Sequence, residues 1–259
     1  MNVNTDPKTR LLWYRIFPSP LGHILIAQSD RGIAAIEFLE PDKSLRASRL
    51  SRKPELELAR GRDGQDIEGA YQDLLDYLHG RRRGFDWPLD LRWVRSEFHR
   101  SVLEATAAIP YGSVVSYAGL ARLIGRPSAA RPVAQALRWN PLPIVIPCHR
   151  VVGSSGALTG YAGNKVALKQ RLLSLEGVPT VRAGKTGPLT IQTQAMYVRH
   201  PGERAYCLPT CPSVLPCGRA TLLRIASRER AEEAGLAPCR ICRPDLNPLP
   251  RAPCQAVFS

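Results

Sequence analysis

The chain has 259 residues, a length that fits one large domain or two to three small ones. It contains no run of about 18 apolar residues, which excludes a membrane-spanning helix. Residues 1–10 are polar and lack the apolar stretch of a secretory signal. We therefore expect a cytoplasmic protein without a membrane partner, in which the seven cysteines are metal ligands or nucleophiles rather than disulfides.

The formal net charge of +14 is unevenly distributed along the chain. Residues 1–91 hold 14 Lys and Arg against 14 Asp and Glu, whereas residues 92–180 hold 11 against 3. Residues 195–259 are also basic, with 9 against 5. Because attraction to phosphate is the sequence-independent part of nucleic-acid binding, this distribution favours a polyanionic partner for the middle and the end of the chain.

The first segment predicts a sheet followed by helices. Residues 11–39 alternate apolar runs with turns, which is typical of a hairpin-rich sheet. Residues 41–65 are polar and charged, and we expect a helix with loose ends there. Residues 67–78 place apolar side chains at helical spacing, and Gly80 ends that helix. Together these elements predict an N-terminal α/β domain over residues 1–91.

A second domain is predicted over residues 92–180, and it is rich in helices. An amphipathic helix covers residues 96–109, Ser116 can cap a short helix through Ile124, and Ser128 can cap another through Trp139. Two helices joined by a short glycine-containing turn fit a helix-turn-helix. The spacing leaves two interpretations open, which are a DNA-binding helix carrying Arg131 and an Ala-rich helix that only packs tightly.

The segment 144–152 places a thiol beside an imidazole at the end of an apolar, β-branched run. We expect a strand that Pro147 stops, followed by Cys148 and His149. A cysteine is nucleophilic as a thiolate, and nearby His or Arg lowers its pKa from about 8.5. The alternative is an inert cysteine at a strand end, because free cysteine is among the most buried residue types.

The end of the chain predicts a linker and a small metal site. Residues 181–194 lack apolar periodicity and look like a linker to a module over residues 195–250, before a tail at 251–259. Cys207-x3-Cys211 and Cys239-x2-Cys242 are separated by 27 residues, a pattern that suits tetrahedral zinc with four cysteine ligands. Cys217 and Cys254 lack such spacing, and we expect free thiols at both.

Five short motifs stand in one order along residues 111–163. They are Tyr-Gly-Ser-Val-Val-Ser-Tyr at 111–117, Ala-Ala-Arg-Pro-Val at 129–133, Asn-Pro at 140–141, Pro-Cys-His-Arg-Val at 147–151 and Gly-Tyr-Ala-Gly at 160–163. Together they resemble the O6-alkylguanine-DNA alkyltransferases, the methylated-DNA–protein-cysteine methyltransferases, over residues 10–178. The resemblance implies an α/β protein with a ribonuclease H-like N-terminal domain and a winged-helix-like alkyltransferase domain that contains the helix-turn-helix.

The implied function is single-turnover repair of double-stranded alkylated DNA. An alkyl group on O6 of guanine, or on O4 of thymine, would pass to Cys148 after the base is flipped out of the duplex. The product thioether is not readily hydrolysed, so each molecule would act once. A non-enzymatic sensor that only flips alkylated bases is the rival, but such relatives lack the acceptor cysteine.

The resemblance also assigns roles to individual residues. His149 takes the thiol proton through a water, Glu176 orients the imidazole, and Asn140 holds the turn beneath the cysteine. Tyr117 donates a hydrogen bond to the departing guanine, and Arg131 replaces the flipped base in the stack, with its helix in the minor groove. The remaining residues expected to bind DNA or substrate are Ala129, Ala130, Arg138, Tyr161 and Ala162. Asn164 departs from the family's usual glycine at that position.

The residues around the four cysteines resemble the metal-binding domain of the bacterial adaptive-response protein. That resemblance implies zinc bound by Cys207, Cys211, Cys239 and Cys242, with Cys207 as a possible second methyl acceptor for methylphosphotriesters. The segment before Met196 is shorter than in that family, and no DNA-binding helix pair follows Pro244. A third hypothesis is a regulator whose DNA affinity rises when Cys207 is methylated. No protein partner can be inferred.

Overall fold

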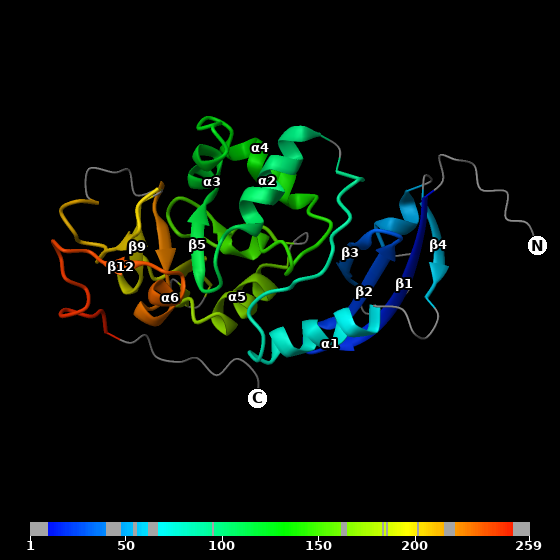
Figure 1. Cartoon of the computed structure of the whole chain (residues 1–259), viewed down its shortest axis with the longest axis horizontal. Coiled ribbons are helices and arrows are strands. Elements are labelled where there is room, and N and C mark those ends of the chain that lie inside the picture. Colours follow the sequence, from blue (N-terminus) through cyan, green and yellow to red (C-terminus); the bar gives the residue numbers. More distant parts are fainter. Residues whose placement is uncertain are drawn as a thin grey trace, which may run out of the picture. The chain divides into compact units, whose positions relative to one another are not determined.

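The computed structural model describes residues 10–39, 48–53, 56–61, 67–94, 96–161, 165–182, 184, 186–200, 202–214 and 221–250. Two compact units make up the chain (Figure 1). Unit 1 comprises Met1–Val94 and Pro141–Val145, and unit 2 comprises Arg95–Asn140 and Ile146–Ser259. Among the described residues, no helix combines the length and apolar character needed to cross a bilayer.

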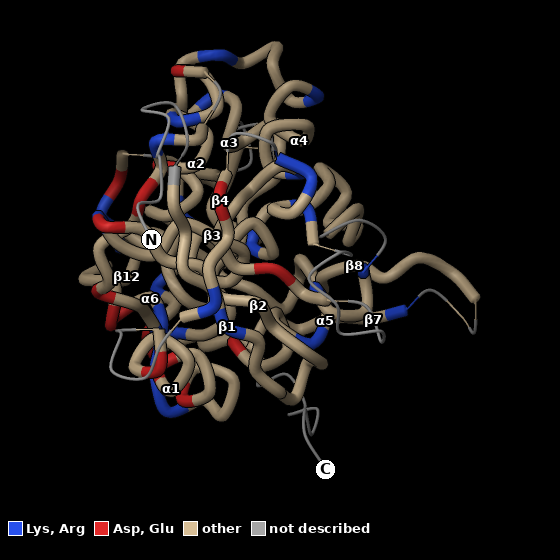
Figure 2. The backbone as a smooth tube through the Cα atoms, turned by 90° about the vertical axis from the view of Figure 1, so that its right-hand side faces the viewer, with Lys and Arg blue, Asp and Glu red and all other residues tan. Residues whose placement is uncertain are grey.

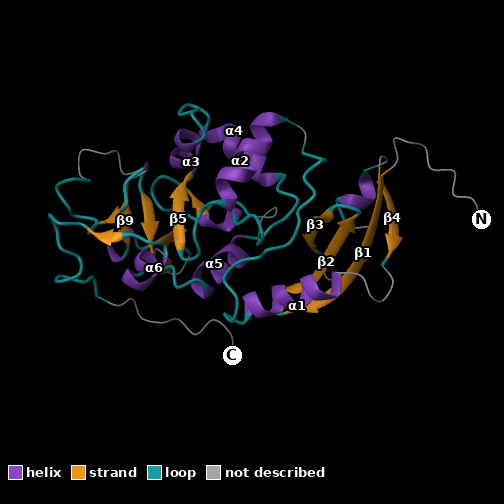
Figure 3. Ribbon diagram, in the orientation of Figure 1, coloured by secondary structure: helices purple, strands orange, loops and turns teal. Residues whose placement is uncertain are grey.

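Unit 1 is a four-stranded sheet with a helix on one face (Figure 3). Its strands lie in the order β3-β2-β1-β4, with β4 parallel to β1 and the other pairs antiparallel. The strands are β1 Arg10–Ser19, β2 Gly22–Ser29, β3 Gly32–Phe38 and β4 Leu56–Arg60. The hairpin-rich sheet predicted for residues 11–39 is confirmed.

The helix predicted over residues 41–65 is wrong in the described part of that segment. A short 3-10 helix, η2 at Leu50–Arg52, is followed by strand β4. Leu56 and Leu58 alternate with charged residues and pack against the core of the sheet, which is the two-residue period of a strand. Residues 41–47, 54–55 and 62–65 of the prediction lie outside the described residues.

The predicted helix over residues 67–78 is confirmed as α1, Ile67–Leu78. Its apolar side chains at helical spacing are buried, including those of Leu74, Tyr77 and Leu78. The helix ends before Gly80, which adopts a φ of 75°. Glycine adopts this left-handed backbone conformation readily, which explains why the helix ends just before Gly80.

Unit 2 contains the helices that carry most of the predicted DNA-binding residues. They are α2 Glu97–Ala107, α3 Tyr117–Leu123, α4 Ala130–Arg138, α5 Val166–Leu175 and α6 Arg228–Glu233. Ser96 and Ser116 cap α2 and α3 by accepting bonds from the backbone N–H groups of His99 and Gly119. The predicted cap at Ser128 is wrong, because Ala129 is the N-cap of α4 and no side chain accepts a bond there.

A second four-stranded sheet runs through unit 2 in the order β6-β5-β11-β9. Its strands are β5 Ser113–Ser116, β6 Val151–Val152, β9 Tyr197–Arg199 and β11 Leu223–Ile225. In Figure 1 the orange strand β11 lies beside the green β5. Smaller pairs complete the unit, namely β7 Thr180–Arg182 with β8 Leu189–Ile191, and β10 Ala205–Tyr206 with β12 Ala237–Pro238.

The segment expected as a linker, residues 181–194, differs from that expectation. It forms the β7–β8 hairpin and the start of a 3-10 helix, η4 at Thr193–Ala195. Leu189 and Ile191 are buried in a cluster with Val152, Leu173 and other core residues of unit 2. Leu189 and Ile191 are two positions apart, as on one face of a strand. A strand of three residues is too short for this alternation to be recognised in the sequence.

The run before Cys148 is also not the expected strand. Residues 144–145 form a turn in which Ile144 adopts a φ of 76°, a backbone conformation that β-branched residues rarely take. The expected strand does not form because the segment contains three prolines, which lack the backbone N–H donors that a sheet needs. They are Pro141, Pro143 and Pro147. A 3-10 helix, η3 at Cys148–Arg150, follows and leads into β6.

Candidate active site and metal centre

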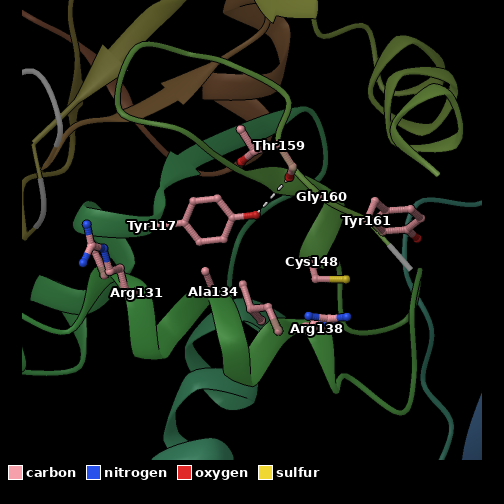
Figure 4. A pocket seen from close by; sticks show the side chains of 10 residues that line it. Tyr117, Arg131, Ala134, Arg138, Cys148, Thr159, Gly160 and Tyr161 are labelled. Atoms are coloured by element: carbon pink, nitrogen blue, oxygen red, sulfur yellow. Dashed lines mark hydrogen bonds between the residues drawn. The ribbon is translucent and has the colours of Figure 1, made fainter. Parts of the chain in front are cut away.

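A pocket of about 500 Å³ in unit 2 brings the predicted cysteine together with the predicted DNA-binding helix. Its lining comes from α3, α4, η3 and the segment before α5. The lining residues are Tyr117, Ala130, Arg131, Ala134, Leu137, Arg138, Cys148, Thr159, Gly160 and Tyr161. In Figure 4 the Cys148 sulfur lies between Tyr161 and Arg138, with α4 below. The volume is typical of a small-molecule or nucleobase-sized site.

Cys148 stands at the first position of η3 and forms part of the pocket wall. The residue is 8% exposed, so its surface opens to the pocket rather than to bulk solvent. Burial raises the pKa of the Cys148 thiol, while a hydrogen bond from Asn140 and the charge of Lys169 act in the opposite direction. The thiol is therefore protonated at rest, and a nucleophilic thiolate requires a base.

His149, the residue after the cysteine in η3, forms a buried pair with Glu176. His149 Nε2 lies 2.7 Å from Glu176 Oε1, and both side chains are fully buried. Burial opposes ionisation of Glu176, but the charges of Arg150 and His149 outweigh it and lower the pKa of Glu176 to about 2. Because an ionised carboxylate only accepts, Nε2 carries the proton and Nδ1 is the basic nitrogen of the neutral ring.

Burial also lowers the pKa of His149, although the Glu176 carboxylate acts against that shift. The imidazole is therefore neutral near pH 7 and able to accept a proton. The Tyr161 ring packs edge-on against the His149 ring, with centroids 6.2 Å apart. A neutral thiol followed in the chain by a neutral imidazole that is paired with a carboxylate has the groups needed for general-base activation of the nucleophile.

Arg150 completes the support of the carboxylate. Its Nε donates to both oxygens of Glu176, at 3.1 and 3.0 Å, and its Nη2 donates to Oε1 at 2.9 Å. Its Nη1 donates to the Ile109 carbonyl at 2.6 Å. The Gly112 backbone N–H donates to Glu176 Oε2 at 2.9 Å. The carboxylate is thus held from several sides in a site without bulk water.

Two further predicted residues lie close to the nucleophile. Asn140 donates through Nδ2 to the Ile146 carbonyl at 2.8 Å, across the turn that precedes the cysteine. Tyr117 begins α3, and its hydroxyl donates to the Thr159 carbonyl at 3.2 Å, shown dashed in Figure 4. Burial raises the pKa of Tyr117, so this hydroxyl keeps its proton and remains a donor.

The predicted DNA-contacting residues cluster on and around α4. Ala129 and Ala130 are partly buried at its start, and Arg131 and Arg138 are exposed. The charges of α4 are marked along the backbone in Figure 2. The second predicted loop residue, Ala162, lies outside the described residues, as do Asn164, Cys217 and Cys254.

Sequence reasoning missed Lys169 as part of the site, and it expected Arg150 to act on the pKa of the Cys148 thiol, whereas Arg150 bonds Glu176. Lys169 belongs to α5, is fully buried, and donates to the carbonyl oxygens of Val151 and Thr159. Burial lowers its pKa to about 8, and its Nζ lies 5.7 Å from the centre of the Tyr117 ring. A lysine inside an otherwise apolar helix face was the available signal, because lysine is almost never fully buried without a role.

A second cluster of side chains in unit 2 consists of four cysteines. The sulfur atoms of Cys207, Cys211, Cys239 and Cys242 all lie within 4.8 Å of one another. Tetrahedral zinc with Zn–S bonds of about 2.3 Å places its sulfurs about 3.8 Å apart, so the four side chains fit the metal. The Leu208 backbone N–H donates to the Cys242 sulfur at 3.4 Å, as expected beside a thiolate ligand.

Ionisation of the four thiols in this cluster also requires a nearby cation. Burial, together with hydrogen bonding and repulsion from Cys239, raises the pKa of the Cys207 thiol. Four thiols this close cannot all ionise in the absence of a positive charge, whereas a dication stabilises every thiolate at once. Cys207 is 2% exposed, and Cys242 is the one ligand of the four that is partly exposed.

Three family models match the chain in the order of its domains. The 6-O-methylguanine DNA methyltransferase, ribonuclease-like domain matches residues 12–91, and the DNA binding domain of the same enzyme matches residues 97–178. The metal binding domain of Ada matches residues 194–245. These matches define a transferase whose cysteine site lies in a DNA-binding domain, followed by a metal-binding domain.

Relatives and solved structures agree with the models. A constitutive methylated-DNA–protein-cysteine methyltransferase of Bacillus subtilis is 35% identical over 166 residues, which are 64% of this chain and 96% of that protein. The O6-methylguanine methyltransferase structure of Mycobacterium tuberculosis has a TM-score of 0.54 at 37% identity, covering 64% of this chain and 92% of its own. A structure of the M. tuberculosis protein in complex with DNA gives 0.53, covering 63% and 91%. The chain belongs to the family of methylated-DNA–protein-cysteine methyltransferases.

Proposed function

We propose that the chain repairs double-stranded DNA by moving the alkyl group of O6-alkylguanine, and of O4-alkylthymine, to Cys148. The observation that carries the proposal is the position of Cys148 in the wall of the pocket, directly before His149 in η3, where His149 is paired with the buried Glu176 carboxylate. A target base lies inside the duplex, so it must rotate into this pocket before the sulfur can reach it.

The transfer is a displacement at the alkyl carbon. The Cys148 proton passes through a water to Nδ1 of His149, and Glu176 stabilises the resulting imidazolium through Nε2. The thiolate forms the sulfur–carbon bond while the carbon–oxygen bond to the base breaks. Tyr117 donates a hydrogen bond to the departing base, which leaves as an anion and takes a proton from water to restore guanine or thymine, while the His149 imidazolium returns its proton to water. The thioether product does not return to the thiol, so each chain acts once.

DNA recognition is assigned to α3 and α4 as a helix-turn-helix of a winged-helix-like domain, with α4 in the minor groove. Two arginines, at 131 and 138, project from α4 at the rim of the pocket. Arg131 would enter the base stack in place of the flipped base, as side chains do in other minor-groove complexes. Ala129 and Ala130 let the helix approach closely because their side chains are small, and Tyr161 with Ala162 covers the base.

The metal-binding domain is proposed to hold zinc through its four cysteines. When bound, zinc supplies charge that keeps the four thiols ionised. Cys207 is proposed as the acceptor of methyl from methylphosphotriesters, as the metal-bound thiolate needs no neighbouring base. Cys207 is only 2% exposed, so this second transfer requires its sulfur to become more accessible than it is in this structure.

The test compares binding with transfer. The Cys148→Ala variant is mixed with a duplex that contains one O6-methylguanine, and intact-protein mass spectrometry is paired with a gel-shift assay. The proposal predicts binding without any gain of a methyl group, whereas the unchanged protein gains one. A Cys148→Ala protein that still accepts the methyl would place the acceptor elsewhere. An unchanged protein that binds the lesion without accepting methyl would favour a sensor.

A further inference from the structure

The metal-binding module is built into the sheet and core of the transferase domain. Strand β11 of the module pairs antiparallel with β5, with Arg224 opposite Val114 and Ile225 opposite Ser113. Met196 is buried in the same cluster as Val114, and Ala226 packs against that cluster. A shared sheet and a shared apolar cluster fix the module on the transferase domain, unlike a domain held only by a flexible linker.

At this junction the module contacts the turn formed by Tyr111 and Gly112. The Arg230 guanidinium of α6 lies 4.6 Å from the centre of the Tyr111 ring, within the range of a cation–π contact. The Ala226 backbone N–H donates to the Gly112 carbonyl at 2.8 Å. Both contacts come from residues beyond position 178, where the transferase family model ends.

Gly112 is enclosed on two sides. A Cβ atom at this position would lie 3.0 Å from the Glu176 carbonyl oxygen and 3.2 Å from Arg230 Cγ, and its φ is +71°. Glycine is therefore required both by the backbone conformation and by the close approach of its neighbours. The turn is clamped between α6 of the module and the end of α5.

The same turn holds the catalytic carboxylate. The Gly112 N–H donates to Glu176 Oε2, while His149 bonds the other oxygen, Oε1. The Tyr111 hydroxyl donates to the Leu175 carbonyl at 3.1 Å, directly before Glu176. A shift of the turn therefore moves one of the bonds that aim the carboxylate at the imidazole.

We propose that Arg230 of the metal-binding module is a positioning residue for alkyl transfer at Cys148. It fixes the Tyr111–Gly112 turn, and the turn fixes the Glu176 carboxylate against His149. The inference rests on the roles proposed above for Cys148, His149 and Glu176. It makes the module a working part of the repair site, whatever chemistry its own cysteines perform.

The test measures the single-turnover rate of methyl transfer from an O6-methylguanine duplex as a function of pH. Arg230→Ala should lower the rate about fivefold. A carboxylate that has moved away stabilises the imidazolium less, so His149 should lose its proton at lower pH and the acidic limb should move to lower pH. Arg230→Lys, which keeps the cation, should restore most of the rate. Arg228→Ala is the matched control, since Arg228 bonds Glu232 and the Asp245 carbonyl within the module.

Two more variants make the outcome decisive. Tyr111→Leu removes the ring from the transferase side and should give the same slowing and the same shift, with no further loss when Arg230→Ala is added. The Tyr111→Leu variant also tests the inference if the Arg230→Ala protein fails to retain zinc. Rates and pH profiles for Arg230→Ala and Tyr111→Leu that equal those of Arg228→Ala would overturn the inference. Glu176→Gln separates the two proposals, because a normal rate in that variant would refute the role of Glu176 itself.

Discussion

The two cysteine sites of unit 2 differ in what surrounds the sulfur. Cys148 is a single thiol in a pocket wall, and its pKa is raised by burial, so a base is needed to remove its proton. Cys207 belongs to a group of four sulfurs within 4.8 Å of one another, where a dication would hold every thiolate without a base. The surroundings of the two sulfurs therefore differ: removal of the Cys148 proton needs a base, whereas bound zinc would stabilise the Cys207 thiolate.

The largest effect that separates the two sites is loss of the metal. Cys239→Ser removes one of four ligands, and we expect the bound zinc to fall from about one per chain to nearly none, with partial unfolding of the module. Metal content by atomic emission and the thermal midpoint measure the change. Arg240→Ala alters an exposed neighbour of the same ligand and serves as the control. Full zinc in Cys239→Ser would contradict the four-cysteine site.

At the Cys148 site the next largest effect comes from Glu176. Glu176→Gln keeps the shape of the side chain but removes the charge that stabilises the imidazolium. We expect single-turnover transfer to slow by about 100-fold, the usual scale of general-base catalysis. Zinc content should stay unchanged, because the two sites depend on different neighbours. A variant that transfers methyl at the normal rate would remove Glu176 from the mechanism.

The same carboxylate links stability to pH. The folded pKa of Glu176 lies at about 2, below its ordinary value of 4.5. The ionised Glu176 carboxylate therefore adds about 3 kcal/mol to the free energy of unfolding above about pH 4.5. This contribution is lost as the pH falls toward 2. Urea unfolding between pH 6 and pH 3 should show a flatter profile for Glu176→Gln. Parallel profiles for the two proteins would mean that the carboxylate is not held as described.

Arg131 should matter for flipping more than for binding. We expect Arg131→Ala to reduce the transfer rate about tenfold at limiting protein, with a smaller loss of affinity, since it removes the side chain that is proposed to fill the vacated stack. Fluorescence of 2-aminopurine opposite the lesion reports the flipped state. Arg126→Ala removes an exposed positive charge between α3 and α4 and should lower affinity only. Equal effects of both changes on flipping would reduce Arg131 to a phosphate contact.

The smallest expected effect concerns Lys169. Its positive charge lowers the pKa of the Cys148 thiol, so Lys169→Met should slow alkylation of Cys148 by iodoacetamide about threefold near neutral pH. Lys165→Met, at the N-cap of the same helix, is the control. An unchanged reaction with iodoacetamide would show that the buried ammonium does not act on the sulfur.

Local patterns in the sequence predicted much of this molecule. The spacing of the four cysteines predicted a cluster that the fold assembles, and apolar periodicity predicted α1 and the hairpins of unit 1. The Cys148–His149 pair was visible because its two members are adjacent in the chain. Signals of this kind succeed where the residues of each pattern lie within about one helical turn or one strand, as the two cysteines of each metal-site pair do.

Contacts between distant segments could not be predicted in the same way. Strand β4 forms because it pairs in parallel with β1, which overrides the polar composition that favoured a helix. Strands β5 and β11 are only 4 and 3 residues long and more than a hundred positions apart, so neither carries a clear period. The bonds from Arg150 and Gly112 to Glu176 exist only once α5 is packed beside η3.

The measurement that tests the account most directly is the position of the methyl group in the unaltered, zinc-loaded protein. The protein is reacted with a duplex containing one O6-methylguanine, digested, and analysed by peptide mass spectrometry. We predict methyl on Cys148 alone, with all four metal-site cysteines unmodified. Methyl on any of those four, or an unmodified Cys148 in a protein that has repaired the duplex, would contradict the account.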